Sequence, residues 1–122
     1  MQMAREKPWT GFGLRTWPTV YPAYAIFDDG TFVNEAHNDW LQWAVEGGLP
    51  LLAAMLIFTA LISLPAARSI WGLGLIAVLV HCLVDYPMQR PQLAGLLFAL
   101  CGVLIGLTHA RHRIPRAGTT PP

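Results

Sequence analysis

Three apolar runs without a charged residue constrain the fold of this chain most strongly. They cover Gly47–Ala67, Ser69–Val84 and Pro91–Thr108, and each is close to the roughly 20 residues that a helix needs to cross the hydrocarbon core of a membrane. Charged residues make up only 12% of the chain, whereas an average soluble domain contains about 25%. The sequence therefore predicts an all-α membrane protein with about three transmembrane helices within residues 49–109.

The distribution of arginines predicts which side of the membrane each connection faces. The segment after the third run is basic and contains no acidic residue, and short loops rich in Arg and Lys stay in the cytoplasm. Residues 110–122 are therefore predicted to form a basic cytoplasmic tail, and the short link at Arg68 faces the same side. Residues 1–46 and the loop 86–92 then lie outside. Because residues 1–8 lack the apolar core of a signal peptide, we expect this chain to be the C-terminal part of a longer polytopic protein.

The segment that precedes the first apolar run suits the membrane–water interface. Residues 1–35 mix many Pro and Gly residues with Trp, Tyr and Phe, which prevents long helices but favours an interfacial loop. Residues 36–48 are predicted to form a short interfacial helix. Asn34 would be its N-cap and Gly47 would end it.

The first candidate for chemistry is His37, followed directly by Asn38 and Asp39. A neutral imidazole can accept a proton from a hydroxyl near neutral pH, which is what a general base in glycosyl or acyl transfer must do. Asn38 could orient a ligand or cap a helix, and Asp39 is expected to point elsewhere on the helix. The alternative is that all three are hydrated residues of a surface loop.

The second candidate group closes the second apolar run. His81 and Asp85 are four residues apart, so they share one face of a helix, and Arg90 follows beyond a proline. Ionisable groups at the end of a span usually face the bundle interior or a water-filled cavity. The alternative is a structural His–Asp contact with an interfacial arginine. The two cysteines, Cys82 and Cys101, are interpreted as apolar fillers, and no metal cluster is predicted.

These motifs resemble the O-antigen ligase and polymerase superfamily. The resemblance rests on Gly11-Phe12-Gly13, on His37-Asn38-Asp39-Trp40-Leu41-Gln42 with Glu46-x-Gly48-Leu49, and on His81-Cys82-Leu83-Val84-Asp85-Tyr86-Pro87 with Pro91. They occur in the family's order and span most of the chain. Two features depart from the family pattern. The family has a glycine three positions after the one matched by Gly48, where this chain has Leu51. Family members also have about ten to twelve spans, whereas about three are predicted here.

The resemblance implies a multi-pass protein of the bacterial inner membrane, with residues 1–35 as a periplasmic loop. Such enzymes transfer a glycan from undecaprenyl diphosphate to lipid A-core or to another glycan acceptor, without a cofactor or metal. It implies that His37 is catalytic, that Asn38, Arg15 and Arg90 bind substrate, and that His81, Asp85 and Glu46 support the site. Expected partners are the bilayer, the lipid-linked glycan, its acceptor and further transmembrane helices of a longer parent or partner, but not nucleic acid.

Several alternative functions stay open from the sequence. The motifs do not distinguish a ligase from an O-antigen repeat polymerase. A transport-type membrane subunit could use His81 and Asp85 as a proton or ion relay. A third possibility is a non-catalytic gene remnant, an inactive fragment that keeps the motifs without the activity.

Overall fold

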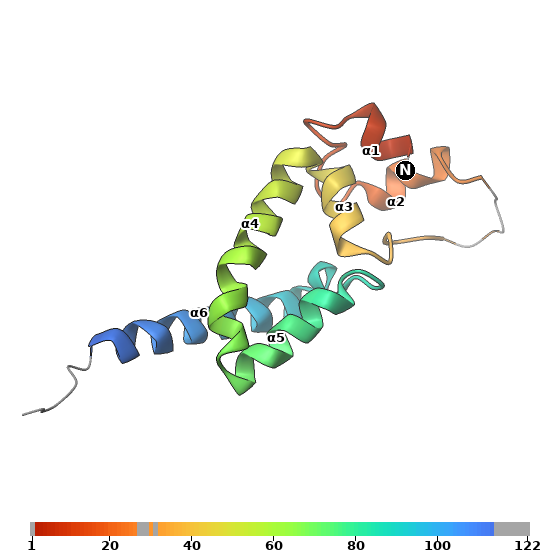
Figure 1. Cartoon of the computed structure of the whole chain (residues 1–122). Coiled ribbons are helices and arrows are strands. Elements are labelled where there is room, and N and C mark those ends of the chain that lie inside the picture. Colours follow the sequence, from red (N-terminus) through yellow and green to blue (C-terminus); the bar gives the residue numbers. More distant parts are fainter. Residues whose placement is uncertain (1, 27–29, 31, 114–122) are drawn as a thin grey trace, which may run out of the picture.

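The computed structural model describes residues 2–26, 30 and 32–113, which contain helices and turns but no strand (Figure 1). Three short helical segments precede an eight-residue helix, and three longer helices follow. In chain order they are α1 (Gln2–Glu6), α2 (Trp17–Val20), η1 (Tyr21–Ala23), α3 (Asp39–Glu46), α4 (Gly48–Ala67), α5 (Ile70–His81), η2 (Pro87–Gln89) and α6 (Pro91–Arg113).

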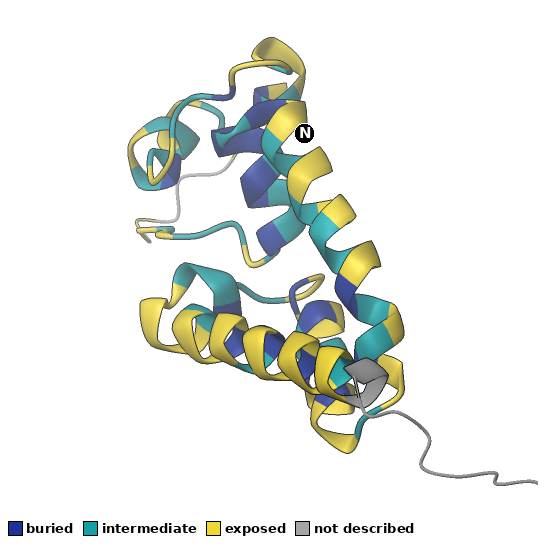
Figure 2. Ribbon diagram, turned by 90° about the vertical axis from the view of Figure 1, so that its left-hand side faces the viewer, coloured by how far each residue is buried: buried dark blue, intermediate teal, exposed yellow. Residues whose placement is uncertain are grey.

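Two of the helices are long and apolar enough to cross a membrane. They are α4 and the segment Pro91–Ala110 of α6, each of 20 residues. Only 11% and 17% of their most apolar windows are buried inside the molecule, and Figure 2 shows exposed residues along the length of both helices. A core helix of a soluble protein would be mostly covered, so these exposed apolar surfaces support a membrane environment.

The third predicted span is shorter in the structure than in the prediction. Helix α5 contains 12 residues and ends at His81, and the chain then turns through residues 82–85 with backbone hydrogen bonds of the three- and four-residue type. Twelve helical residues extend about 18 Å, against a hydrocarbon thickness of about 30 Å. The structure therefore contains two helices of spanning length, and a third crossing stays a prediction.

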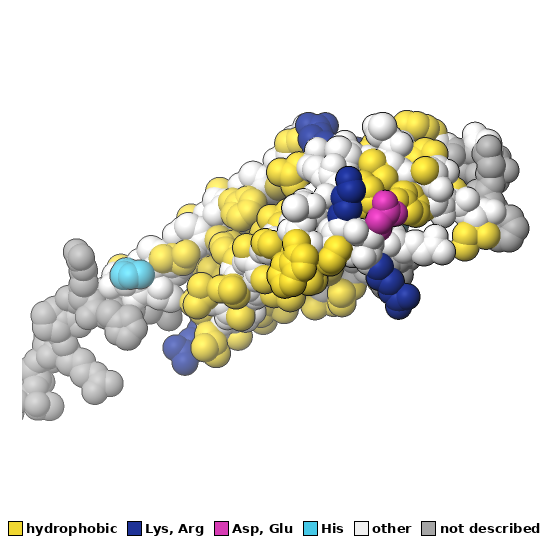
Figure 3. Space-filling view, turned by 90° about the horizontal axis from the view of Figure 1, so that it is seen from above, with side chains coloured by type: hydrophobic (Ala, Val, Ile, Leu, Met, Phe, Trp, Pro, Cys, Tyr) yellow, Lys and Arg dark blue, Asp and Glu magenta, His cyan; other side chains and the backbone are white. Residues whose placement is uncertain are grey.

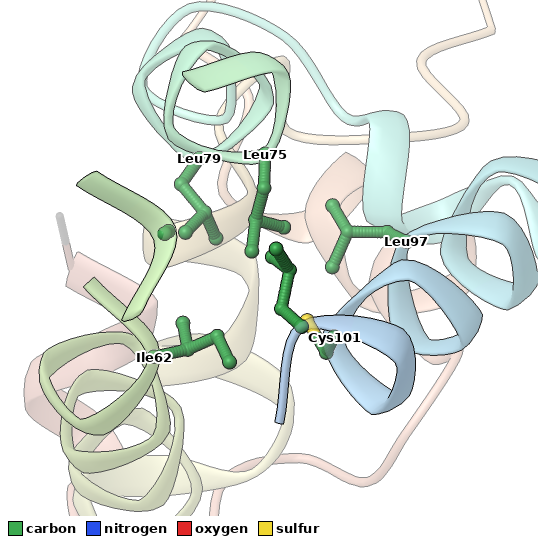
Figure 4. Packing of buried hydrophobic residues seen from close by; sticks show 7 residues of the cluster. Ile62, Leu75, Leu79, Leu97 and Cys101 are labelled. Carbon is green, nitrogen blue, oxygen red and sulfur yellow. The ribbon is translucent and has the colours of Figure 1, made fainter. Parts of the chain in front are cut away.

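The core of the helical region lies where α4, α5 and α6 meet. Figure 4 shows that its side chains come from all three helices and point toward one another, namely Ile62, Leu75, Leu79, Leu97 and Cys101. Ala66 and Leu104 complete the buried cluster. Within a membrane the contacts themselves, rather than escape from water, hold such helices together.

The N-terminal segments pack around α3 and the start of α4 (Figure 1). A second apolar cluster joins Met3, Trp17 and Val45. Two backbone hydrogen bonds connect the loop to the end of α3, from Phe12 N to the Val45 oxygen at 3.0 Å and from Gly13 N to the Glu46 oxygen at 2.9 Å. The N-terminal segments thus form a layer over α3 and the start of α4, called the N-terminal layer below.

Helix α3 begins later than the sequence predicted. Its N-cap is Asn38, which has an extended backbone and accepts a hydrogen bond from the Leu41 N–H, so the predicted cap at Asn34 is wrong. Residues 36–38 precede the helix because His37 has a positive φ of 49° and Asn38 is extended, and neither conformation is helical. The Ala36 N–H donates to the Gln42 side chain. At the other end of the chain, α6 continues to Arg113, whereas residues 114–122 of the predicted tail lie outside the described residues.

Candidate functional site

The structure brings the two sequence motifs together around one carboxylate. His37 Nδ1 lies 3.7 Å from Asp85 Oδ1, and His81 Nε2 lies 3.4 Å from Asp85 Oδ2. All three side chains are substantially exposed, so they remain accessible to a ligand. Both distances exceed those of strong hydrogen bonds, although catalytic contacts often shorten only when substrate binds.

His37 lies in the turn that precedes α3 rather than on the helix itself. Its backbone has a positive φ of 49°, a conformation that is uncommon for residues other than glycine but several-fold enriched for His, Asn and Asp. The imidazole meets the Tyr86 ring edge to face, with 4.8 Å between ring centroids. The strained turn therefore directs the imidazole toward Asp85 and Tyr86 while leaving two-thirds of the side chain exposed.

Asn38 holds the His37 turn in place through both ends of its amide. Its oxygen caps α3 by accepting from the Leu41 N–H at 2.9 Å, and its nitrogen donates to the Leu83 oxygen at 2.8 Å. These contacts favour the capping role over direct ligand binding, because only one amide N–H is left for another partner.

Asp39 is fully buried and contacts the segment that carries the second motif. Its Oδ2 accepts from the Met88 N–H at 2.9 Å, and its Oδ1 accepts from the Gln89 side chain at 3.1 Å. Burial raises the pKa of Asp39 above its usual value, and hydrogen bonds from Met88, Cys82 and Gln89 only partly oppose that rise. The sequence analysis did not predict the burial of Asp39 or its contacts with this segment.

Glu46 fixes the loop that contains Arg15. Its carboxylate is buried and accepts from the Arg15 N–H at 2.8 Å and the Trp17 N–H at 3.0 Å. Gln42 also donates to it at 3.3 Å. Carboxylates bonded to backbone N–H groups are stronger acceptors than neutral groups, so Glu46 can hold Arg15 in its positive-φ conformation of 62°.

The glycines of the first motif allow the loop to approach α3 and α4. A side chain on Gly11 would come within 2.2 Å of the Glu46 oxygen, and one on Gly48 within 2.7 Å of the Trp9 oxygen. Both glycines have positive φ angles, which other residues adopt at a cost. The motif spacing thus reflects backbone packing, and not a phosphate-binding loop.

A polar cleft of about 660 Å³ is lined by Tyr86, whose ring contacts His37. His37, His81 and Asp85 are not among its lining residues. Arg15 and Arg90 both line it, so the structure brings together two arginines that are far apart in sequence. The Arg90 guanidinium lies over the Tyr86 ring and donates to the Tyr86 hydroxyl at 3.1 Å. On the face drawn in Figure 3, most charged side chains gather at the end formed by the N-terminal segments, while hydrophobic side chains cover the long helices.

The remaining lining of the cleft is mostly polar. It includes the side chains of Asn34, Glu35, Gln42, Gln89 and Gln92. Such a surface can hydrogen-bond hydroxyl groups while the guanidinium groups attract an anion. Among the described residues, no group of three or more His, Cys, Asp or Glu side chains could hold a metal ion.

Comparison with known proteins gives this geometry a family context. Residues 1–56 match the O-antigen ligase family. The match covers the N-terminal layer, α3 and the first part of α4, and therefore includes Gly11, Gly13 and His37. No curated protein and no solved structure matches the chain.

The O-antigen ligase match confirms the resemblance drawn from the first motif. Together with the two exposed apolar helices, it supports a membrane protein of the ligase or polymerase kind. The second motif lies beyond the matched residues, but its Asp85 and Tyr86 contact His37 of the matched part.

Two residues of this candidate site had no role assigned from the sequence. Tyr86 contacts both His37 and Arg90. Asp39 binds Met88, in the turn between Tyr86 and Arg90. Tyr86 could have been noticed as the aromatic residue inside the second motif. The burial of Asp39 could not, because its partners are a backbone N–H and an amide from a distant segment.

Proposed function

We propose that this chain is the C-terminal portion of a ligase-like membrane glycosyltransferase. It would transfer a glycan from undecaprenyl diphosphate to lipid A-core or to another glycan acceptor. The observation that carries this proposal is the position of His37, which contacts Asp85 and Tyr86 beside a cleft lined by Arg15 and Arg90. The O-antigen ligase match of residues 1–56 supports the reaction class.

In the proposed reaction, His37 is the general base. With the proton of the neutral ring on Nδ1, facing Asp85, the Nε2 lone pair accepts the proton of the acceptor hydroxyl. The hydroxyl oxygen then forms a bond to the anomeric carbon, while the bond from that carbon to the diphosphate oxygen breaks. Asp85 stabilises the imidazolium that results, and His81 contacts the other oxygen of the same carboxylate.

Arg15 and Arg90 would stabilise the charge that develops on the leaving diphosphate. A guanidinium donates several N–H groups in a planar array that suits phosphate oxygens, and fixed cationic groups lower the barrier where negative charge develops. Glu46 supports this role by holding the backbone of Arg15, and Tyr86 does so by contacting Arg90.

The membrane arrangement is part of the same proposal. Helices α4 and α6 would span a bacterial inner membrane, with α5 as a third hydrophobic element and the N-terminal layer on the periplasmic face. Transfer of a lipid-linked glycan at a membrane surface requires such a site, because the lipid part of the donor stays in the bilayer.

The decisive experiment replaces His37 by Ala in the protein that carries this chain. General base catalysis typically contributes about 10²–10⁴-fold to a rate, so we expect glycan transfer to fall by about that factor. His109→Ala is the matched control, because His109 is exposed on α6 and its ring Nδ1 lies 2.9 Å from the Ile105 oxygen of its own helix, away from the cleft. Wild-type transfer by the His37→Ala protein would remove His37 from the mechanism.

A further inference from the structure

Asp39 is a fully buried acid that the proposed reaction does not use. Its two carboxylate oxygens receive the Met88 N–H and the Gln89 side-chain amide, at 2.9 and 3.1 Å. Its own N–H donates to the Cys82 oxygen at 2.9 Å. A carboxylate is costly to remove from water unless hydrogen bonds replace its hydration, and here each oxygen receives a hydrogen bond from the second motif's segment.

The two groups that bind the Asp39 carboxylate lie in a segment that also carries contacts of the candidate site. Met88 and Gln89 belong to η2, which lies between Tyr86, whose ring contacts His37, and Arg90, which lines the cleft. Asp39 itself follows His37 by two residues. Its carboxylate therefore connects the segment that carries the base to the turn that carries the base's contacts.

Other hydrogen bonds from residues 38 and 39 reach residues 82–85, which precede the 86–90 turn. Asn38 binds the Leu83 oxygen, and the Asp39 N–H is shared between the Cys82 oxygen at 2.9 Å and the Asp85 oxygen at 3.3 Å. These bonds persist when the Asp39 side chain is changed, because one belongs to Asn38 and the other to the backbone. The hydrogen bonds that residues 86–90 donate to α3 end on the Asp39 carboxylate.

We propose that Asp39 is a positioning residue, whose carboxylate holds the 86–90 turn so that Tyr86 contacts His37 and Arg90 faces the cleft. The catalytic meaning of this role rests on the proposed function, but the geometric role does not. Removal of the carboxylate would release the turn while the start of α3 stays capped by Asn38.

The experiment measures the contact between His37 and Tyr86 directly. The chain has only four His and three Tyr residues, so selective labelling of both residue types in detergent micelles gives a sparse NMR spectrum. In the wild-type protein we expect a nuclear Overhauser effect between the two rings. In Asp39→Ala it should be lost, whereas Asp39→Asn should retain it, because an amide oxygen still accepts from the Met88 N–H and Gln89 can reverse its amide.

Two further variants keep the test decisive. Ser63→Ala removes a hydrogen bond within α4, from Ser63 Oγ to the Thr59 oxygen, and should leave the ring contact unchanged. Gln89→Ala removes one of the two hydrogen bonds that the Asp39 carboxylate accepts from η2, and it should weaken the His37–Tyr86 contact even if Asp39→Ala does not fold. Retention of the wild-type signal in Asp39→Ala, or in Gln89→Ala where Asp39→Ala does not fold, would overturn the proposal.

Transfer assays then separate this inference from the proposed function. A displacement of about 1 Å can lower a rate by about 10²-fold, so Asp39→Ala should lose about that factor and Asp39→Asn should restore most of it. If His37→Ala transfers glycan normally but Asp39→Ala loses the ring contact, the proposed function fails and the positioning role stands. If His37→Ala is inactive and Asp39→Ala keeps both the ring contact and the rate, the opposite holds.

Discussion

His37 Nδ1 lies 3.7 Å from Asp85 Oδ1, although α3, α4 and α5 separate the two residues along the chain. The other oxygen of the same carboxylate faces His81 at 3.4 Å. One acid thus contacts two imidazoles that come from different motifs. Such an arrangement couples the motifs energetically, and the coupling can be measured.

A double-mutant cycle at His37 and Asp85 should be non-additive. If Asp85 acts only by orienting and stabilising the His37 imidazole, its removal costs little once that imidazole is absent. Contacting residues commonly couple by about 0.5–3 kcal/mol, and because both side chains are exposed we expect the lower part of that range. The measurement compares glycan transfer by His37→Ala, Asp85→Asn and the double variant. Independent effects, whose factors multiply, would contradict the shared role.

Neutralising either arginine of the cleft should weaken binding of the diphosphate donor. A hydrogen bond to a charged group contributes about 1.5–3 kcal/mol, so the KM for the lipid-linked donor should rise about 10- to 100-fold. Arg15→Asn is the preferred change at the first position, because asparagine tolerates the positive φ there. Arg90→Gln is its partner variant.

The control for these variants is Arg68→Gln. Arg68 caps the opposite end of α4, away from the cleft, so its neutralisation should leave the donor KM unchanged. An equal effect of all three changes would show that the arginines act through the overall charge of the protein and not through the cleft.

Replacement of Gly11 by Ala should destabilise the N-terminal layer. The new Cβ would approach the Glu46 oxygen to 2.2 Å at a φ of +61°, so left-handed strain adds to a backbone overlap. Together these cost about 2–5 kcal/mol, measured as the free energy of unfolding in detergent. Gly95→Ala is the matched control, because no heavy atom lies within 4 Å of its added Cβ, and a helical glycine replaced by alanine gains up to about 1 kcal/mol.

The sequence predicted the apolar elements well because their signal is local. The first and third uncharged runs correspond to α4 and α6, whose length and hydropathy suffice to cross a membrane. The second run did not reveal where α5 would end, because its last residues are apolar too and form a turn. That turn is held by Asn38 and Asp39 from another segment.

The sequence analysis named the members of the candidate site but could not give their geometry. His37, His81, Asp85 and the two arginines were named from residue chemistry and motif order, whereas their proximity depends on how α5 returns toward the start of α3. The prediction of a helix across residues 36–38 was wrong because Asn38, and not Asn34, caps the helix. His37 consequently lies in a turn, which no helical periodicity could indicate.

The stability of the protein should depend on pH through Asp39. Burial raises the pKa of this carboxyl above its usual value of 3.8 in the folded state, so the folded protein binds a proton more tightly than the unfolded chain does. The stabilising contribution is therefore fully present below the unfolded pKa and is lost as pH rises through the folded pKa. Of the neighbouring titratable groups, the Asp85 carboxylate raises the pKa of Asp39 further by charge repulsion, and a hydrogen bond from Cys82 lowers it.

Asp39→Asn should remove this component of the pH dependence. The amide cannot ionise, so the difference in unfolding temperature between Asp39→Asn and wild type should grow in favour of the variant as pH increases from about 4. Thermal unfolding in detergent across that pH range measures the difference. Parallel curves for the two proteins would mean that Asp39 has the same pKa in the folded and unfolded states, and that its hydrogen bonds from Met88 and Gln89 fully compensate for burial.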